Sequence, residues 1–564
     1  MKRFALMLVC LAAGVMSLSA GGQSGSQGSA GGLTTLRAWG VNREFNLSGR
    51  VLRFSDWIDG TVPSRLYEAW EQELAKKGLK FEYTLLMGDQ IATAFQTLLA
   101  SGRLNDYDWI APTGLDERTR LSLVSQNRLF PLNKAVEQYS EGPAKTRLSS
   151  DPNMGKMVKQ HSLEDGNLYW LPQTGISYLN YQGKRYDLGA IVHGFIRKDW
   201  LDKAGLGIPK TLDDFYNALV AFRTRDINGN GVRDEVIVDS LSGFDNGIGE
   251  WFGLGAGGIV AVVDNRAVSP WYQAHVRDYI AYMNKLYTAG LIQVAAAGTN
   301  TAEYTSANRV GFHRGYLTET WTEPTINTPA GAAKAHLVPL VIQAYPDTPP
   351  LVWSDGALAT SLGSGLYSIP SGSKNVDKMV KVLDFMLSPE YPVLSEMGIE
   401  GYTFTVSPDG SRQRLRPNAD NVGLDQDLGA ASQASLYTGW GGVFTRLQDY
   451  DWMPEFNSVD NVAKELGYAG GNPERRAFGM DYMQGKYKIS QNPGSVQAFP
   501  TAREIDRIAA ITTDLNTYSS ELLAALIMGE KSLSGWDGYI ADLKRLGLDD
   551  LISISQARID RMAK

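Results

Sequence analysis

Apolar positions recur at regular intervals after residue 50 and predict alternating strands and helices. Leu66, Trp70 and Leu74 are spaced as one face of a helix, and lysines followed by Gly78 end it. Residues 79–85 alternate between apolar and polar side chains, as in a half-buried strand. A second helix over residues 91–98 and a strand over 107–111 follow. With a first strand at 51–54, this order is βαβαβ, which predicts a parallel sheet covered by helices.

A second α/β region begins near residues 194–197. Thr211 and Asp214 there resemble a capping box, with Asp in place of Glu, before a helix that carries Phe215, Leu219 and Phe222. No internal repeat is found, which excludes solenoids and propellers. The chain therefore reads as two α/β units.

The N-terminus indicates export. Lys2 and Arg3 precede an apolar run from Phe4 to Val15 and then small residues, so residues 1–20 are predicted to be a secretory signal peptide. No later stretch approaches the roughly 20 apolar residues that a membrane span needs. Residues 18–21 resemble a bacterial lipobox, but Gly21 stands where the lipidated Cys would be, so a lipid anchor is not established. The Gly/Ser-rich stretch that follows is interpreted as a flexible tether over residues 21–45.

Composition narrows the function classes. A chain of 564 residues with 43% apolar residues forms several folded domains and is not disordered. The 54 basic against 61 acidic residues give a net charge of −7, which argues against nucleic acid as a partner. One Cys and five scattered His exclude a disulfide framework and a cysteine zinc site.

One loop carries ligands for a hard cation. It places side-chain oxygens at alternating positions around a turn at Gly231, as in a calcium loop, whereas a soft metal would need Cys or His. An EF-hand would have Glu where Ile237 stands, so Glu235 must supply the bidentate carboxylate and Val232 a backbone carbonyl. The alternative is an Asn/Gly-rich turn without an ion. The predicted set for a structural Ca²⁺ is Asp226, Asn228, Asn230, Val232, Asp234 and Glu235.

Several stretches in order resemble the solute-binding proteins of bacterial ABC importers, in particular the calcium-containing group with the alginate-binding and LipO-type proteins. They are residues 95–102, 165–172, 195–201, 211–215, the loop 226–235, 286–291 and 536–539. This resemblance implies a two-lobe, periplasmic-binding-protein-like α/β fold with a hinge and a ligand cleft between the lobes. By similarity, residues 46–172 and 337–397 form the N-terminal lobe, and residues 173–336 and 398–564 form the C-terminal lobe.

An aromatic-rich cleft suits an oligosaccharide, because rings stack on the apolar faces of sugars while charged and amide groups bind hydroxyls. The chain has 13 Trp and 26 Tyr, most of which are expected to be core residues. Aromatic candidates lie in loops and at strand ends: Trp57, Trp251, Tyr316, Trp353, Tyr402 and Trp440. Candidate hydrogen-bonding partners are Asp56, Arg314 and Asp355.

Other functions have less support. A secreted glycoside hydrolase or polysaccharide lyase would share the export signal, calcium and aromatics, but no catalytic signature stands out. An adhesion module would predict repeats or β-sandwiches. The sequence therefore predicts an exported, non-enzymatic, monomeric receptor, peripheral to the membrane. We expect it to bind an oligosaccharide, with or without uronate, by lobe closure and to deliver it to ABC permease subunits.

Overall fold

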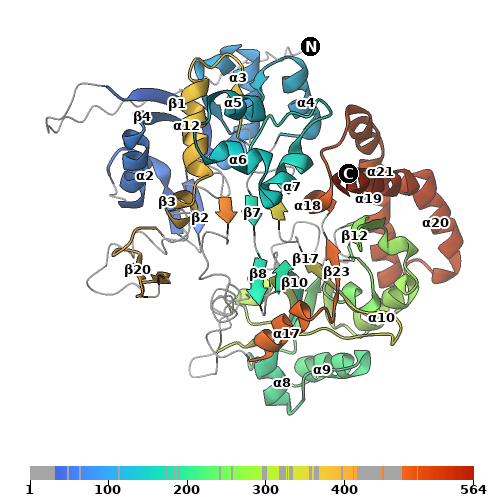
Figure 1. Cartoon of the computed structure of the whole chain (residues 1–564). Helices are drawn as coiled ribbons and strands as arrows, with labels where there is room; N and C mark the ends of the chain where they lie inside the picture. The colour runs from blue at the N-terminus through green and yellow to red at the C-terminus, as the bar shows by residue number, and fades with distance from the viewer. Residues whose placement is uncertain are drawn as a thin grey trace, which may run out of the picture.

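The computed structural model describes residues 32–563 with gaps, of which the longest are 295–301, 317–325, 416–446 and 450–472. The chain has an α/β architecture with open sheets in two lobes (Figure 1). The first lobe, mostly blue and cyan in Figure 1, lies above the second lobe, mostly green. The predicted signal peptide lies outside the described residues. Among the described helices, none has the length and apolar character needed to cross a membrane.

The first lobe is built on a parallel sheet of order β4-β1-β5. Leu36 and Ala38 on one face of β1 are fully buried in one apolar cluster, and Trp39 on the other face is buried in a second. Both faces of this sheet are therefore covered, as expected for parallel strands. Its strands are β1 (Thr34–Asn42), β4 (Leu79–Leu86) and β5 (Trp109–Ile110). The covering helices are α2 (Arg65–Lys76), α3 (Ile91–Ala100), α4 (Glu117–Ser125), α5 (Leu132–Tyr139), α6 (Pro143–Ser149), α7 (Pro152–His161) and α12 (Val376–Met386).

The predicted helices α2 and α3 and strand β4 are confirmed, but the first strand of the sheet was misplaced. The stretch predicted at 51–54 is split between β3 (Arg50–Arg53), which forms a hairpin with β2 (Glu44–Leu47), and α1 (Phe54–Ile58). The central strand is β1, which lies inside the range 21–45 interpreted as a tether. Burial of its apolar side chains on both faces is the physical reason for this correction.

The second lobe contains a mixed sheet of nine strands in the order β13-β12-β23-β17-β10-β15-β11-β14, with β16 paired to β10. These strands are β10 (Ile191–Arg197), β11 (Val236–Asp239), β12 (Ala261–Val263), β13 (Arg266–Val268), β14 (Ile292–Val294), β15 (Val310–Tyr316), β16 (Leu337–Pro339), β17 (Leu351–Ser354) and β23 (Lys488–Gln491). Its helices include α8 (Lys198–Ala204), α9 (Leu212–Thr224), the short η3 (Gly249–Phe252), α10 (Val276–Thr288) and α17 (Pro473–Met483). The predicted capping box of α9 is confirmed, because Thr211 and Asp214 exchange side-chain to backbone hydrogen bonds of 3.1 Å each.

Two further groups of elements join the lobes. A small sheet of order β18-β7-β22 is formed by β7 (Thr174–Ile176), β18 (Leu358–Thr360) and β22 (Leu447–Asp449). In Figure 1, β7 lies between the two lobes. The C-terminal helices are α18 (Pro493–Val496), α19 (Ala502–Met528), α20 (Trp536–Arg545) and α21 (Leu548–Ala563).

Candidate binding site and cation loop

Three strand ends of the second lobe meet on the side that faces the first lobe. Strand β10 lies between β15 and β17, and Val192 at its start is paired with Tyr316 and with Trp353, near the ends of those two strands. Strand β17 is parallel to β23 and ends beside it. The chain leaves β17 toward β18, which lies in the small sheet between the lobes. Carboxyl ends of strands in open α/β sheets are the usual place for a ligand.

Arg314 and Trp353 come together at this edge. Arg314 is opposite Gly194 on β10 and Trp353 is opposite Val192, so the two side chains project from the same face of the sheet. The Arg314 guanidinium carbon lies 5.6 Å from the centroid of the Trp353 ring, a cation–π contact. Both side chains are only partly buried. A flat indole beside a planar group of N–H donors can hold the apolar face of a sugar and its hydroxyls together.

Glu250 was missed by the sequence reasoning, which chose its neighbour Trp251. Its side chain is 1% exposed, and its Oε1 lies 3.7 Å from Arg314 Nε. A carboxylate so deeply buried needs a cationic partner, and Arg314 supplies it. The only signal in the sequence was an acidic residue within the short run Glu-Trp-Phe-Gly.

Trp251 is a core residue of the second lobe. It is fully buried and makes edge contacts with Phe215 and Phe312, whose ring centroids lie 4.9 and 5.5 Å away. An indole without an exposed face cannot stack on a sugar, so the structure corrects this choice. Gly194 belongs to the same packing, since a Cβ there would lie 2.4 Å from the Phe312 ring.

The other predicted sugar contacts are divided between the first lobe and undescribed positions. Asp56 lies in α1, two residues after Phe54 of the first-lobe core, and Trp57 follows it in the same helix. The Tyr402 ring lies 4.4 Å from the guanidinium of Arg65, which begins α2. Tyr316 ends β15, but its side chain is not described, and Asp355 and Trp440 lie outside the described residues.

The predicted cation loop follows α9 and is closed by its own side chains. The Asp226 carboxylate accepts hydrogen bonds from the N–H groups of Asn230 and Gly231, at 3.1 and 2.9 Å. Asn228 Oδ1 accepts from the Asn230 N–H at 2.9 Å, and Asn230 Oδ1 from the Val232 N–H at 2.7 Å. Gly231 has a φ of +84°, which glycine adopts without strain. The loop therefore has the tight turn that the sequence predicts.

The acidic side chains of this loop have different partners. Glu235 is 1% exposed; its Oε1 accepts from the Asn228 N–H at 3.0 Å, and its Oε2 has no hydrogen-bond partner within the described structure. Asp234 pairs with Arg309, Oδ2 to Nε, at 2.8 Å. In the described part of the chain, no group of three or more His, Cys, Asp or Glu side chains could hold a metal ion. The predicted set relies equally on amide and backbone oxygens, which suit Ca²⁺, and the buried Glu235 Oε2 fits a ligand position.

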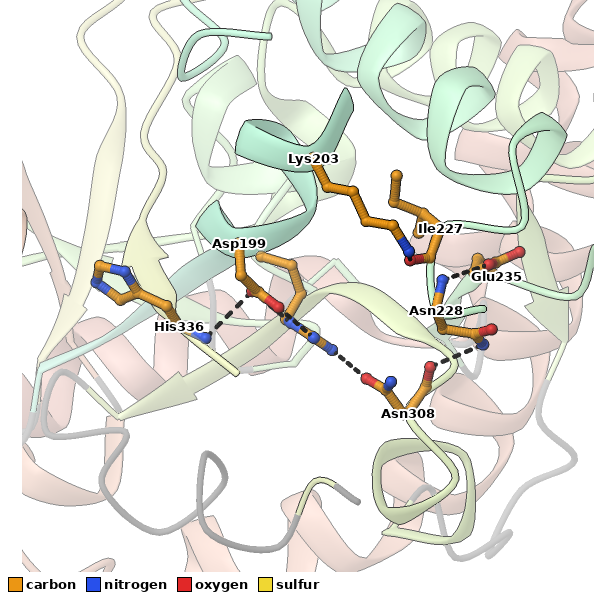
Figure 2. A network of polar contacts seen from close by, with 8 residues as sticks. Asp199, Lys203, Ile227, Asn228, Glu235, Asn308 and His336 are labelled. Atoms are coloured by element: carbon orange, nitrogen blue, oxygen red, sulfur yellow. Dashed lines mark hydrogen bonds and ion pairs between the residues drawn. The ribbon is translucent and has the colours of Figure 1, made fainter. Parts of the chain in front are cut away.

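The loop is tied to the sheet by a polar network (Figure 2). Asn228 Nδ2 donates to the backbone oxygen of Asn308 at 3.0 Å, and Arg197 Nη1 donates to Asn308 Oδ1 at 2.6 Å. Asp199 Oδ1 in turn accepts from Arg197 Nε at 2.8 Å and from the His336 N–H at 3.1 Å. The network therefore links the loop to the end of β10, the residues before β15 and the start of β16.

Comparisons with known proteins agree on one family and one fold. The family model described as bacterial extracellular solute-binding protein matches residues 59–391. A fructooligosaccharide ABC transporter substrate-binding protein, FusA of Streptococcus pneumoniae, is 24% identical over 510 residues, which are 87% of this chain and 86% of that protein.

Two solved structures are similar along nearly their whole length. An EF-hand mutant of FusA in complex with fructo-nystose has a TM-score of 0.63 at 20% identity, over 94% of this chain and 99% of that one. The alginate-binding protein AlgQ2 without calcium ion has a TM-score of 0.58 at 21% identity, over 93% of this chain and 98% of that one. At these identities the likeness shows the two-lobe fold.

Proposed function

Because this chain belongs to the family of bacterial extracellular solute-binding proteins, we propose that it is the exported receptor of an ABC importer and binds an oligosaccharide between its lobes. FusA, named for fructooligosaccharide, and AlgQ2, named for alginate, support this ligand class. The observation that carries the proposal is the pair of Arg314 and Trp353 at the strand ends that face the first lobe. The partner that takes over the ligand is then the membrane permease of the importer.

Lobe closure needs a hinge, and we place it at the sheet β18-β7-β22. Strand β7 follows the last first-lobe residues and precedes β10, whereas β18 follows β17 and precedes the return to the first lobe at Tyr367. Since β16 and β17 are hydrogen-bonded in the second-lobe sheet, we propose that the return crossing follows Ser354 and not residue 336. Few residues would then absorb the rotation that brings the lobes together on a ligand.

We further propose a structural Ca²⁺ held by Asp226, Asn228, Asn230, the Val232 carbonyl, Asp234 and Glu235. A bound cation would offset the loop's carboxylates. Through the network in Figure 2, an ordered loop would also hold β10 and β15 in place. These two strands, with β17, form the binding edge, which is the sheet edge that carries Arg314 and Trp353. The EF-hand mutant made of FusA supports a cation loop in this family.

Isothermal titration with a panel of neutral and acidic trisaccharides tests the receptor. We expect stoichiometric binding of at least one of them and no new product by chromatography after overnight incubation. Turnover would favour a hydrolase or lyase. The absence of binding across the panel would count against an oligosaccharide ligand.

A further inference from the structure

The described binding edge has a feature that bears on ligand charge. We infer that this site selects neutral over uronate-containing oligosaccharides, because the buried Glu250 already neutralises Arg314. This inference rests on the proposed function, and it assigns Glu250 as a positioning residue behind the guanidinium.

Glu250 is held in place by the backbone around it. The Asn246 side-chain oxygen accepts from the N–H groups of Ile248 and Gly249 at 3.0 and 3.1 Å, and its amide nitrogen donates to the Tyr279 hydroxyl at 2.7 Å. Gly249 packs so tightly that a Cβ would lie 2.4 Å from the Phe244 carbonyl oxygen. The short helix η3 therefore cannot turn Glu250 away from Arg314 without breaking several contacts.

The carboxylate changes what Arg314 offers a ligand. An isolated guanidinium is an excellent partner for a carboxylate, since it can donate two parallel hydrogen bonds. Here Glu250 approaches Nε at 3.7 Å from the buried side. The positive charge of Arg314, which would attract a uronate, is therefore matched by the buried carboxylate of Glu250. Because the pair is largely shielded from water, the Glu250 carboxylate also repels an incoming anion at short range.

Trp353 favours the same selection. The face of an indole carries negative electrostatic potential, which suits the C–H groups of a neutral sugar ring and a cation. Arg314 lies over this ring at 5.6 Å. The two planar groups together therefore form a platform for uncharged rings.

The test compares a neutral with an acidic trisaccharide, maltotriose or 1-kestose against trigalacturonate, by isothermal titration. For the unmodified protein we expect the better neutral ligand to bind at least about tenfold more tightly, which is roughly 1.4 kcal/mol. In Glu250→Gln, which keeps the size of the side chain, we expect this preference to shrink by about tenfold. Glu504→Gln is the matched control, because it removes a partly buried carboxylate from an arginine pair, with Arg561 at 2.6 Å, in the C-terminal helices.

The outcomes separate this inference from the proposed function. Equal or tighter binding of trigalacturonate by the unmodified protein would overturn the inference and leave the receptor intact. So would a Glu250→Gln variant that keeps the full neutral preference, or a Glu504→Gln variant that loses it to the same extent. Failure to bind any saccharide would count against the receptor itself. If Glu250→Gln does not fold, the relative affinities of the unmodified protein for the neutral and the acidic trisaccharide still test the inference.

Discussion

Trp251 and Trp353 were both predicted from the sequence to contact a sugar, but replacing each by Ala is expected to have opposite effects on stability and binding. Trp353 is only partly buried and its described ring contact is with Arg314, so Trp353→Ala should cost about 1–2 kcal/mol of stability, from lost burial and the lost cation–π contact. As an anchor for a sugar ring it should contribute about 2 kcal/mol to binding, a loss of roughly thirtyfold in affinity. Trp251 is fully buried against Phe215 and Phe312, and Trp251→Ala should cost about 3–5 kcal/mol.

Thermal melting and titration on the same preparations distinguish the two effects. Trp251→Ala should lower the melting temperature by roughly 5–10 °C, while any folded fraction still binds the saccharide. Trp353→Ala should melt within a few degrees of the unmodified protein and bind weakly. The reasoning is refuted if Trp251→Ala melts normally and loses binding, or if Trp353→Ala binds with unchanged affinity.

Three further changes test the acid response, the cation loop and the C-terminal helix. Burial, with the nearby charge of Arg120, lowers the pKa of His161 to about 3, whereas in the unfolded chain this histidine takes up its proton near the ordinary pKa of 6.5. The free energy of unfolding should therefore fall as the pH drops below about 6.5, by up to ~1.4 kcal/mol per pH unit. In denaturant titrations, His161→Gln should show a shallower fall of this free energy with pH. An equal slope in the variant and the unmodified protein would contradict this explanation. Glu235→Gln should reduce both bound calcium by elemental analysis and the melting temperature in calcium buffer, whereas Asp213→Asn on the exposed face of α9 should change neither. Thr501→Ala removes the capping box of α19 and should cost about 1 kcal/mol of stability at constant affinity; a loss of affinity at unchanged stability would be inconsistent with a cap.

Elements with a complete local signature could be predicted from the sequence. The helix α2 carries its buried residues Leu66, Trp70 and Leu74 at helical spacing, and the capping box of α9 needs only two side chains three residues apart. Strand β1 has no complete signature, because the alternation of the buried Leu36 and Ala38 with the exposed Arg37 breaks at Trp39, which is buried on the opposite face. Its place at the centre of the sheet depends on pairing with strands that are distant in the sequence.

The binding edge could be predicted only in part, for a related reason. Arg314 and Trp353 stood at predicted strand ends, but their proximity depends on β10 lying between β15 and β17. Trp251 and Glu250 are adjacent in a short turn, and nothing local shows which one contacts the core and which one contacts Arg314. The cation loop was easier, because its ligands are nearly consecutive and its turn is closed by its own side chains.

The apolar periodicity of helix α19 predicts a helix, but it does not show that the helix packs against both lobes. Ile505 in its first turn packs in the first-lobe cluster around Trp170, whereas Leu515 and Leu522 pack in the core of the second lobe. A helix of 27 residues is about 40 Å long and bends little without breaking hydrogen bonds. The contact with the first lobe is concentrated at its start, where Asp506 pairs with Arg118 at 2.7 Å. The apolar stripe of α19 is continuous along the sequence, and only the tertiary fold divides it between two cores.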